Sequence, residues 1–247
     1  MTTTEEKQEK ILDLFENIKS QTMVFLDELQ WISDVDKEKL TGYLNDTAPI
    51  VGIEGNYLED SVFEKYNNGI NKRVYGGSFL NMYLNQKKQV RDAHLKNIEK
   101  NGNDVLDGLI TYTQPVILVN NKIILPVGMI SKMFYEPEGP MYLTYGALGK
   151  AIADQLIYAL VNENKSNNDS AKSYKDELNC IVKEFLSDSI NEITKFESDA
   201  VYANLIGCKI AYDAYQKWVE ANGEESVPVG IDYTTNQLFW IATLSDE

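Results

Sequence analysis

The spacing of apolar residues predicts a chain that is mostly helical. Side chains suited to a core recur every three or four positions between residues 8 and 30, with acidic residues between them: Ile11, Leu14, Phe15, Ile18, Thr22, Phe25, Leu26 and Leu29. This period is typical of an amphipathic helix with one buried face. Ser33 is a suitable N-cap for a second helix, and residues 78–100 predict a long, more polar one.

Only one region has a clear strand pattern. The runs 116–119 and 122–125 are short, apolar and separated by Asn120-Asn121, which predicts a β-hairpin. Helices are expected again at about 141–162, 172–193 and 197–221, the last with its C-cap at Asn222-Gly223. In the first of these helices, the spacing predicts a buried stripe formed by Leu148, Ile152, Leu156 and Ala159.

These elements predict an α+β fold, mainly α-helical, with a small sheet. A length of 247 residues is enough for one sizeable core, so we expect a single domain over 1–247. Its parts are a helical N-terminal part at about 5–100, a hairpin and helix at about 110–162, and C-terminal helices at about 172–247.

The charge narrows the classes of partner. A formal net charge of −15 disfavours binding to nucleic acid or to an anionic membrane, because such binding relies on Lys and Arg. No run of 18 apolar residues predicts a membrane span, and residues 1–7 lack the pattern of a signal peptide. With 43% hydrophobic residues, we expect the chain to fold without a cofactor.

The chemistry centres on residues 145–158. Here Tyr-Gly-Ala-Leu-Gly, at 145–149, leads into a helix that carries Asp-Gln-Leu-Ile-Tyr at 154–158. The segment resembles the neprilysin and endothelin-converting-enzyme family of zinc metallopeptidases, in which a similar Tyr-Gly-Ala-Ile-Gly precedes His-Glu-x-x-His. The resemblance implies a thermolysin-like (zincin) catalytic lobe and covers nearly the whole chain. Residues 121–130 and 227–241 also resemble family segments in order and spacing.

The residues at the motif positions do not support zinc catalysis. Two histidines four apart share a helix face and grip one zinc ion, while the Glu between them activates water. Asp154 can still offer an oxygen ligand, but the neutral amide of Gln155 cannot act as a general base, and Tyr158 is a poor ligand. The chain has one histidine, His94, so no two-histidine site can be built from it.

The other positions that the resemblance implies are altered too. Residues 200–215 match the family's later motif, but its ligand Glu falls on Ala200 and the Asp that orients a ligand falls on Asn204. The family's substrate-gripping sequence falls on Thr113 and Gln114, followed by a proline. The sequence ends at Glu247, so we expect the family's terminal His and Arg, and its large N-terminal half, to be missing.

We therefore expect an inactive peptidase homologue with no catalytic residue, metal or cofactor, which acts as a binding, regulatory or structural protein for a protein or peptide partner. One alternative is an altered hydrolase in which Asp154 and carboxylates such as Glu136, Glu138 or Glu192 hold another metal, with hard oxygen ligands favouring Mg²⁺, Mn²⁺ or Ca²⁺. A second is an abundant storage or surface protein.

The two cysteines leave the compartment open. The resemblance implies that Cys180 corresponds to a family cysteine whose partner lies beyond the end of this chain, whereas Cys208 stands where the family usually has Leu. The two can pair only if their Cα atoms come within about 7 Å. Family members are mostly secreted or membrane-anchored, and nothing in this sequence decides between those compartments and the cytosol.

Overall fold

The fold is given by a computed structural model that describes residues 5–52, 78–99, 116–119, 121–126, 128–130, 135–136, 138–164, 168–185 and 195–244. These residues are mainly helical, with a small sheet. The elements in chain order are α1 (Glu5–Glu28), α2 (Asp34–Asp46), β1 (Ala48–Val51), α4 (Phe79–Glu99), β2 (Ile117–Val119), β3 (Lys122–Leu125), α5 (Met141–Thr144), the π-helical turn η3 (Tyr145–Gly149), α6 (Lys150–Asn164), α7 (Asn168–Phe185), α8 (Lys195–Asn222) and α9 (Thr235–Thr243). No helix in these ranges has both the length and the apolar character needed to cross a membrane.

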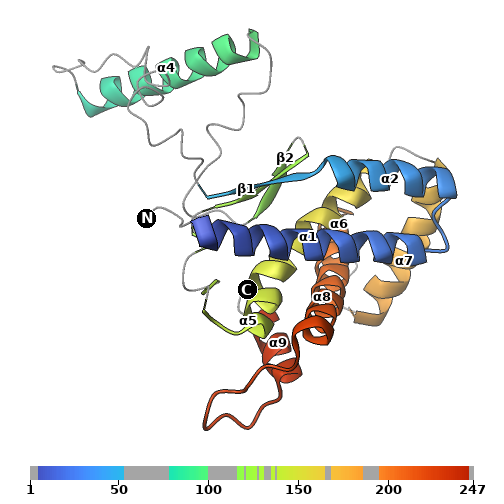
Figure 1. Cartoon of the computed structure of the whole chain (residues 1–247). Coiled ribbons are helices and arrows are strands. Elements are labelled where there is room, and N and C mark those ends of the chain that lie inside the picture. The colour runs from blue at the N-terminus through green and yellow to red at the C-terminus, as the bar shows by residue number, and fades with distance from the viewer. Residues whose placement is uncertain are drawn as a thin grey trace.

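The core forms where α1, α6 and α8 pack together (Figure 1). Four side chains of α1 are at most 1% exposed to solvent: Ile11, Leu14, Phe15 and Ile18. They belong to the stripe that the sequence predicts, so the helical period identified the buried face of α1. Burial of each such side chain contributes about 1.5–3 kcal/mol to the free energy of folding, before the cost of ordering the side chain is subtracted.

The sheet has the strand order β1-β3-β2. The predicted hairpin is confirmed: β2 and β3 are antiparallel, with Ile117 opposite Ile124. Asn121 at its turn has φ 57°, a left-handed conformation that Asn tolerates better than most residues. β1 pairs parallel to β3, with Ala48 opposite Lys122, and was not predicted. Its four residues are too few to display a strand alternation.

The predicted helix at 141–162 is confirmed as one helical rod with a π-helical turn inside it. α5, η3 and α6 follow one another without a break from Met141 to Asn164. At the turn, Gly146 packs against α9: a Cβ built on it would lie 2.7 Å from the backbone oxygen of Phe239 and 2.8 Å from Ala242 Cβ. A π-turn inside an α-helix is uncommon and frequently marks a functional region.

The C-terminal part closes one side of this rod. α8 ends at Asn222, and Gly223 follows with φ +89°, which confirms the predicted C-cap. α9 was not predicted, although its capping box is legible in the sequence: Thr234 and Gln237 bond reciprocally at its first turn. α9 packs against α5 and η3.

Other boundaries shift by a few residues. The long polar helix expected at 78–100 is α4, the Ser33 cap starts α2, and the helix expected at 197–221 is α8. The helix expected at 172–193 begins earlier, at Asn168, and its described part ends at Phe185, since 186–194 lie outside the described residues. The single-domain assignment stays a prediction.

Glu225 ties the start of the rod to the segment after α8. Its carboxylate accepts hydrogen bonds from the backbone N–H groups of Met141, at 2.6 Å, and Tyr142, at 3.1 Å. These are the first two N–H groups of α5, and the residue before them, Pro140, provides no side-chain cap. A carboxylate here satisfies unpaired donors and favours the positive end of the helix dipole.

We expect Glu225→Gln to lower the free energy of unfolding by about 1–2 kcal/mol, because it removes the charge and one acceptor from this cap. Urea denaturation followed by circular dichroism measures the change. Glu224→Gln, on the exposed neighbouring residue, is the matched control and should stay within about 0.5 kcal/mol of the unchanged chain. Equal losses in the two variants would contradict the capping role.

Candidate functional site

The candidate site is built on α6. The stripe predicted for this helix is confirmed, since Leu148, Ile152 and Leu156 are fully buried and Ala159 is 7% exposed. Asp154, Gln155 and Tyr158 are half-buried. Asp154 and Tyr158 are four residues apart and therefore share one helix face.

Asp154 is held by a lysine of its own helix. Lys150 Nζ lies 3.2 Å from Asp154 Oδ2, and the two side chains are only 6% and 18% exposed. A carboxylate this sheltered needs a positive or hydrogen-bonding partner. The Lys150 ammonium supplies a positive charge next to the Asp154 carboxylate.

Helix α8 packs directly against Asp154. Gly207 of α8 meets Asp154 so closely that a Cβ added to the glycine would overlap Asp154 Oδ1 and lie 2.9 Å from the Asp154 backbone nitrogen. Further along α6, Leu160 and Val161 line a cavity together with Tyr202, which precedes Gly207 on α8. The two helices therefore run antiparallel, and the face of Asp154 is closed by α8.

Of the four remaining predicted positions, the structure describes two, both on α8. Asn204 is half-buried and lies one turn before Gly207, which puts it on the surface of α8 that faces α6. Ala200 is exposed, one turn further from the contact. Thr113 and Gln114 lie outside the described residues, so the predicted substrate strand is not located.

The alternative site of clustered carboxylates is not formed by the residues that are described. Among them no three of His, Cys, Asp and Glu come together in a way that could hold a metal ion. Glu138 instead lies 3.8 Å from Lys10 of α1 and is well exposed, and Glu192 is outside the described residues. Cys180 is exposed, Cys208 is half-buried, and neither is in a disulfide.

A cluster of polar aromatic residues beside α6 was not anticipated from the sequence. The Tyr174 hydroxyl donates to Asp199 Oδ1 at 2.8 Å, and the Tyr174 ring meets the Tyr202 ring edge to face at 5.1 Å. Burial raises the pKa of both tyrosines above the usual 10. Burial likewise raises the pKa of Glu177 above 4.5, although the Trp31 and Tyr202 polar groups directed at it offset part of that rise.

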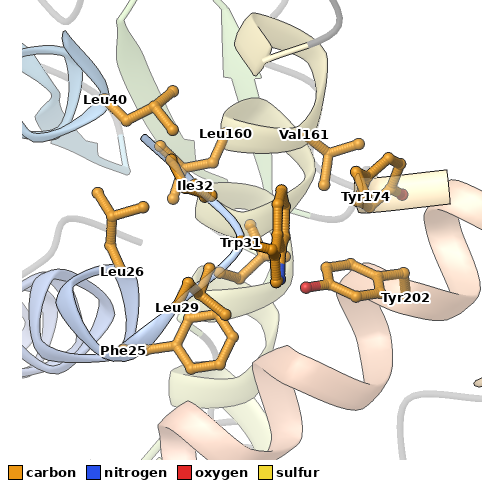
Figure 2. A pocket seen from close by; sticks show the side chains of 11 residues that line it. Phe25, Leu26, Leu29, Trp31, Ile32, Leu40, Leu160, Val161, Tyr174 and Tyr202 are labelled. Carbon is orange, nitrogen blue, oxygen red and sulfur yellow. The ribbon is translucent and has the colours of Figure 1, made fainter. Parts of the chain in front are cut away.

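The cavity next to this cluster is apolar and small (Figure 2). Trp31, Tyr174 and Tyr202 form one wall, and leucine and isoleucine side chains of α1, α2 and α6 form the other. Its volume is about 30 Å³, far below the roughly 300–1,000 Å³ of typical ligand pockets. It is a packing void where helices meet and is too small to be a peptide-binding pocket.

The sequence of this lobe matches a known family. Residues 117–244, which include the rod, α8 and α9, match the sequence model of peptidase family M13. The match covers more than half of the chain. The chain belongs to peptidase family M13. The resemblance stated above and the fold class predicted with it are thereby confirmed.

Curated relatives and solved structures agree with the M13 assignment. Neprilysin-2 of Drosophila melanogaster is 22% identical over 256 residues, covering 94% of this chain and 32% of its own length. The solved Haemonchus galactose-containing glycoprotein complex matches with a TM-score of 0.75 at 16% identity, over 98% of this chain and 41% of that one. The zinc metalloprotease Zmp1 of Mycobacterium tuberculosis, solved with an inhibitor, matches at 0.68 and 16%, over 96% and 38%.

These matches establish a thermolysin-like fold of the M13 type. The chain spans no more than a third of the length of the curated relatives it matches. The described residues do not fit the zinc ion that the family implies. Of the four positions to which the resemblance assigns the protein ligands and their orienting Asp, only Asp154 carries a carboxylate, and Lys150 and Gly207 lie against it.

The Gly207 contact predicts a steric requirement. Gly207→Ala should destabilise the fold by about 1–3 kcal/mol, because the added methyl group forces α8 away from Asp154. Gly42→Ala is the matched control: Gly42 lies inside α2 with open space around it, so this change should stabilise by up to about 1 kcal/mol. Thermal unfolding measures the change in stability of each variant, which should be a loss for Gly207→Ala and a gain for Gly42→Ala. A neutral Gly207→Ala would contradict the close contact.

The raised pKa of Glu177 predicts a dependence of stability on pH. A carboxyl with a higher pKa in the folded state binds its proton more tightly there, so its contribution is present below pH 4.5 and is lost as the pH rises through the folded-state value. We expect Glu177→Gln to remove this loss, so that the variant gains stability relative to the unchanged chain between pH 4 and pH 7. Denaturant titrations across that range test it, with Asp176→Asn, an exposed neighbour, as the control. Parallel curves for the Glu177 variant and the unchanged chain would contradict the prediction.

Proposed function

We propose that this chain is a catalytically inactive member of peptidase family M13 that acts as a binding, regulatory or structural protein. The observation that carries the proposal is the ion pair between Lys150 and Asp154, sheltered where α6 meets α8. At this point of the rod, the family resemblance implies the first zinc ligand. Here the same point carries a carboxylate neutralised by an ammonium group.

The charge of Lys150 acts against a metal at this place. A divalent cation bound to Asp154 would lie within a few ångströms of the ammonium and be repelled by it, and little solvent is present to screen the repulsion. A catalytic zinc also needs about three protein ligands and an open position for water. Gly207 of α8 packs against Asp154, so on that side the carboxylate meets a helix.

The general base that peptide cleavage requires is also missing from its expected position. Gln155 stands at the position of the Glu that activates water, and a neutral amide does not accept a proton at neutral pH. What remains is a helical lobe with a packed interior. Such a lobe is suited to binding through its surface, and its partner is a protein or peptide.

Metal analysis together with a cleavage assay tests the proposal. The purified chain, incubated with zinc and then desalted, should retain far less than one zinc per molecule. It should not cleave fluorogenic peptides above the rate in buffer, and its melting temperature should not change with a chelator. An active M13 peptidase assayed in parallel confirms that the substrates and conditions support cleavage.

Two results would overturn the proposal. One zinc per chain with cleavage that phosphoramidon inhibits would establish a working zinc peptidase. Cleavage that requires added Mg²⁺ or Mn²⁺ and is lost in Asp154→Asn would establish the altered hydrolase instead.

A further inference from the structure

Helix α9 turns an uncharged, apolar face to solvent. Trp240, Ile241 and Leu244 are 44%, 49% and 69% exposed. Leu244 follows Ile241 by three residues and Trp240 by four, so the three side chains lie together on one side of the helix, and we call them the α9 surface. No Asp, Glu, Lys or Arg occurs in α9. Contiguous apolar side chains on an exposed helix mark a place where another molecule packs.

The loop that leads into α9 adds a further apolar group. Figure 1 shows this loop (red) extending away from the helical body. The N–H of Ile231 donates to the Pro228 carbonyl at 3.3 Å, and Gly230 between them has φ +89°, which is the pattern of a type II turn. The turn places Val229 at its outer corner, where this side chain is fully exposed.

Helix α8 holds the α9 surface in a fixed shape. The Tyr212 ring stacks on the Trp240 ring with 5.1 Å between the ring centres, and Gln216 donates a hydrogen bond to Asn236 Oδ1 at 3.0 Å. These two contacts show that the end of α8 runs antiparallel to α9. A partner therefore meets side chains that are already ordered, which lowers the entropic cost of binding.

Acidic side chains border the α9 surface at the end where α9 begins. Residues 216–244 contain four Asp and Glu and one Lys, which gives this segment a net charge of −3. Because Gln216 bonds to Asn236, Glu220 lies one helical turn further along α8, on the side of the loop that carries Asp232. Both carboxylates are exposed. The site thus combines an apolar centre with an acidic border.

We propose that the α9 surface binds a partner segment that is both apolar and basic: an amphipathic helix with Lys or Arg beside its apolar face. The apolar face packs on Trp240, Ile241 and Leu244, and the cations lie near Glu220 and Asp232. This inference rests on the proposed role of the chain as a binding protein. It adds where on the lobe the partner binds and which chemistry the partner has.

The charge of the site disfavours two other occupants. A second copy that docked through the same surface would bring its own Glu220 and Asp232 towards those of the first, and each copy carries a net charge of −15. An anionic membrane would meet the same carboxylates, and α9 has no basic residue to offset them.

A synthetic helix-forming peptide of leucine and lysine, with its leucines on one face, tests the proposal. Fluorescence anisotropy of the labelled peptide should show saturable binding to the full chain at physiological salt concentration. The same peptide with every lysine replaced by glutamate is the charge control and should not bind. Ile241→Ser/Leu244→Ser and Glu220→Lys/Asp232→Lys should each weaken binding at least about tenfold, because the first removes the apolar contact and the second reverses the acidic border.

Each variant has a matched control on exposed residues of α1 and α2: Leu12→Ser/Val35→Ser for the apolar pair and Glu9→Lys/Glu38→Lys for the acidic pair. Both controls should bind the peptide as the unchanged chain does. Equal binding by all four variants would overturn the proposal, since the peptide would then respond only to the overall charge. So would binding of the glutamate peptide, or a dimer or a complex with phosphatidylserine vesicles that Ile241→Ser/Leu244→Ser dissociates.

The failure of this site and the failure of the proposed inactivity give different results, because the binding assay depends on neither zinc nor cleavage. A chain that cleaves peptides and binds the leucine–lysine peptide through α9 would refute the inactivity and keep the site. An inactive chain whose four variants bind equally would refute the site alone.

Discussion

The contact between α6 and α8 at Gly207 is the constraint on which the candidate site depends. A glycine here lets the two helices approach until α8 touches both the backbone and the side chain of Asp154. That approach leaves the Asp154 side chain only 18% exposed, with α8 packed against it. Any chemistry attributed to Asp154 must therefore agree with a closed, packed environment, in which an unneutralised charge is costly.

The π-turn sets where this closed face points. It occupies Tyr145–Gly149, immediately before α6, and widens the helix by one residue, which rotates everything after it relative to α5. Gly146 brings α9 against the turn, and Glu225 fixes the N–H groups at the start of α5. The rod is thus held at its beginning by two segments from the C-terminal part of the chain, and Asp154 takes its orientation from them.

Local patterns in the sequence predicted what is local in the structure. The stripe of α1, the hairpin and the buried side of α6 all follow from apolar spacing, and the family segments around residue 150 identified the fold. The sequence did not predict β1 and α9, because each is short and depends on contacts with a distant segment. β1 pairs with β3, and α9 packs against the rod. The π-turn leaves no mark in apolar spacing. In contrast, the spacing of four residues between Lys150 and Asp154 can be read from the sequence, whereas the burial of the pair is seen only in the structure.

The proposed loss of the zinc site is compatible with where the stability of the fold lies. A catalytic metal sits at the edge of a core that is already formed, unlike a structural zinc that supplies the folding energy itself. In this chain the interior is made of side chains such as Ile152 and Leu156 of α6 and Ile210 of α8, all fully buried. A change of ligands leaves that packing in place but can expose the fold to the cost of a buried charge. Lys150 removes this cost from within the same helix, one turn before Asp154, so no other element has to move.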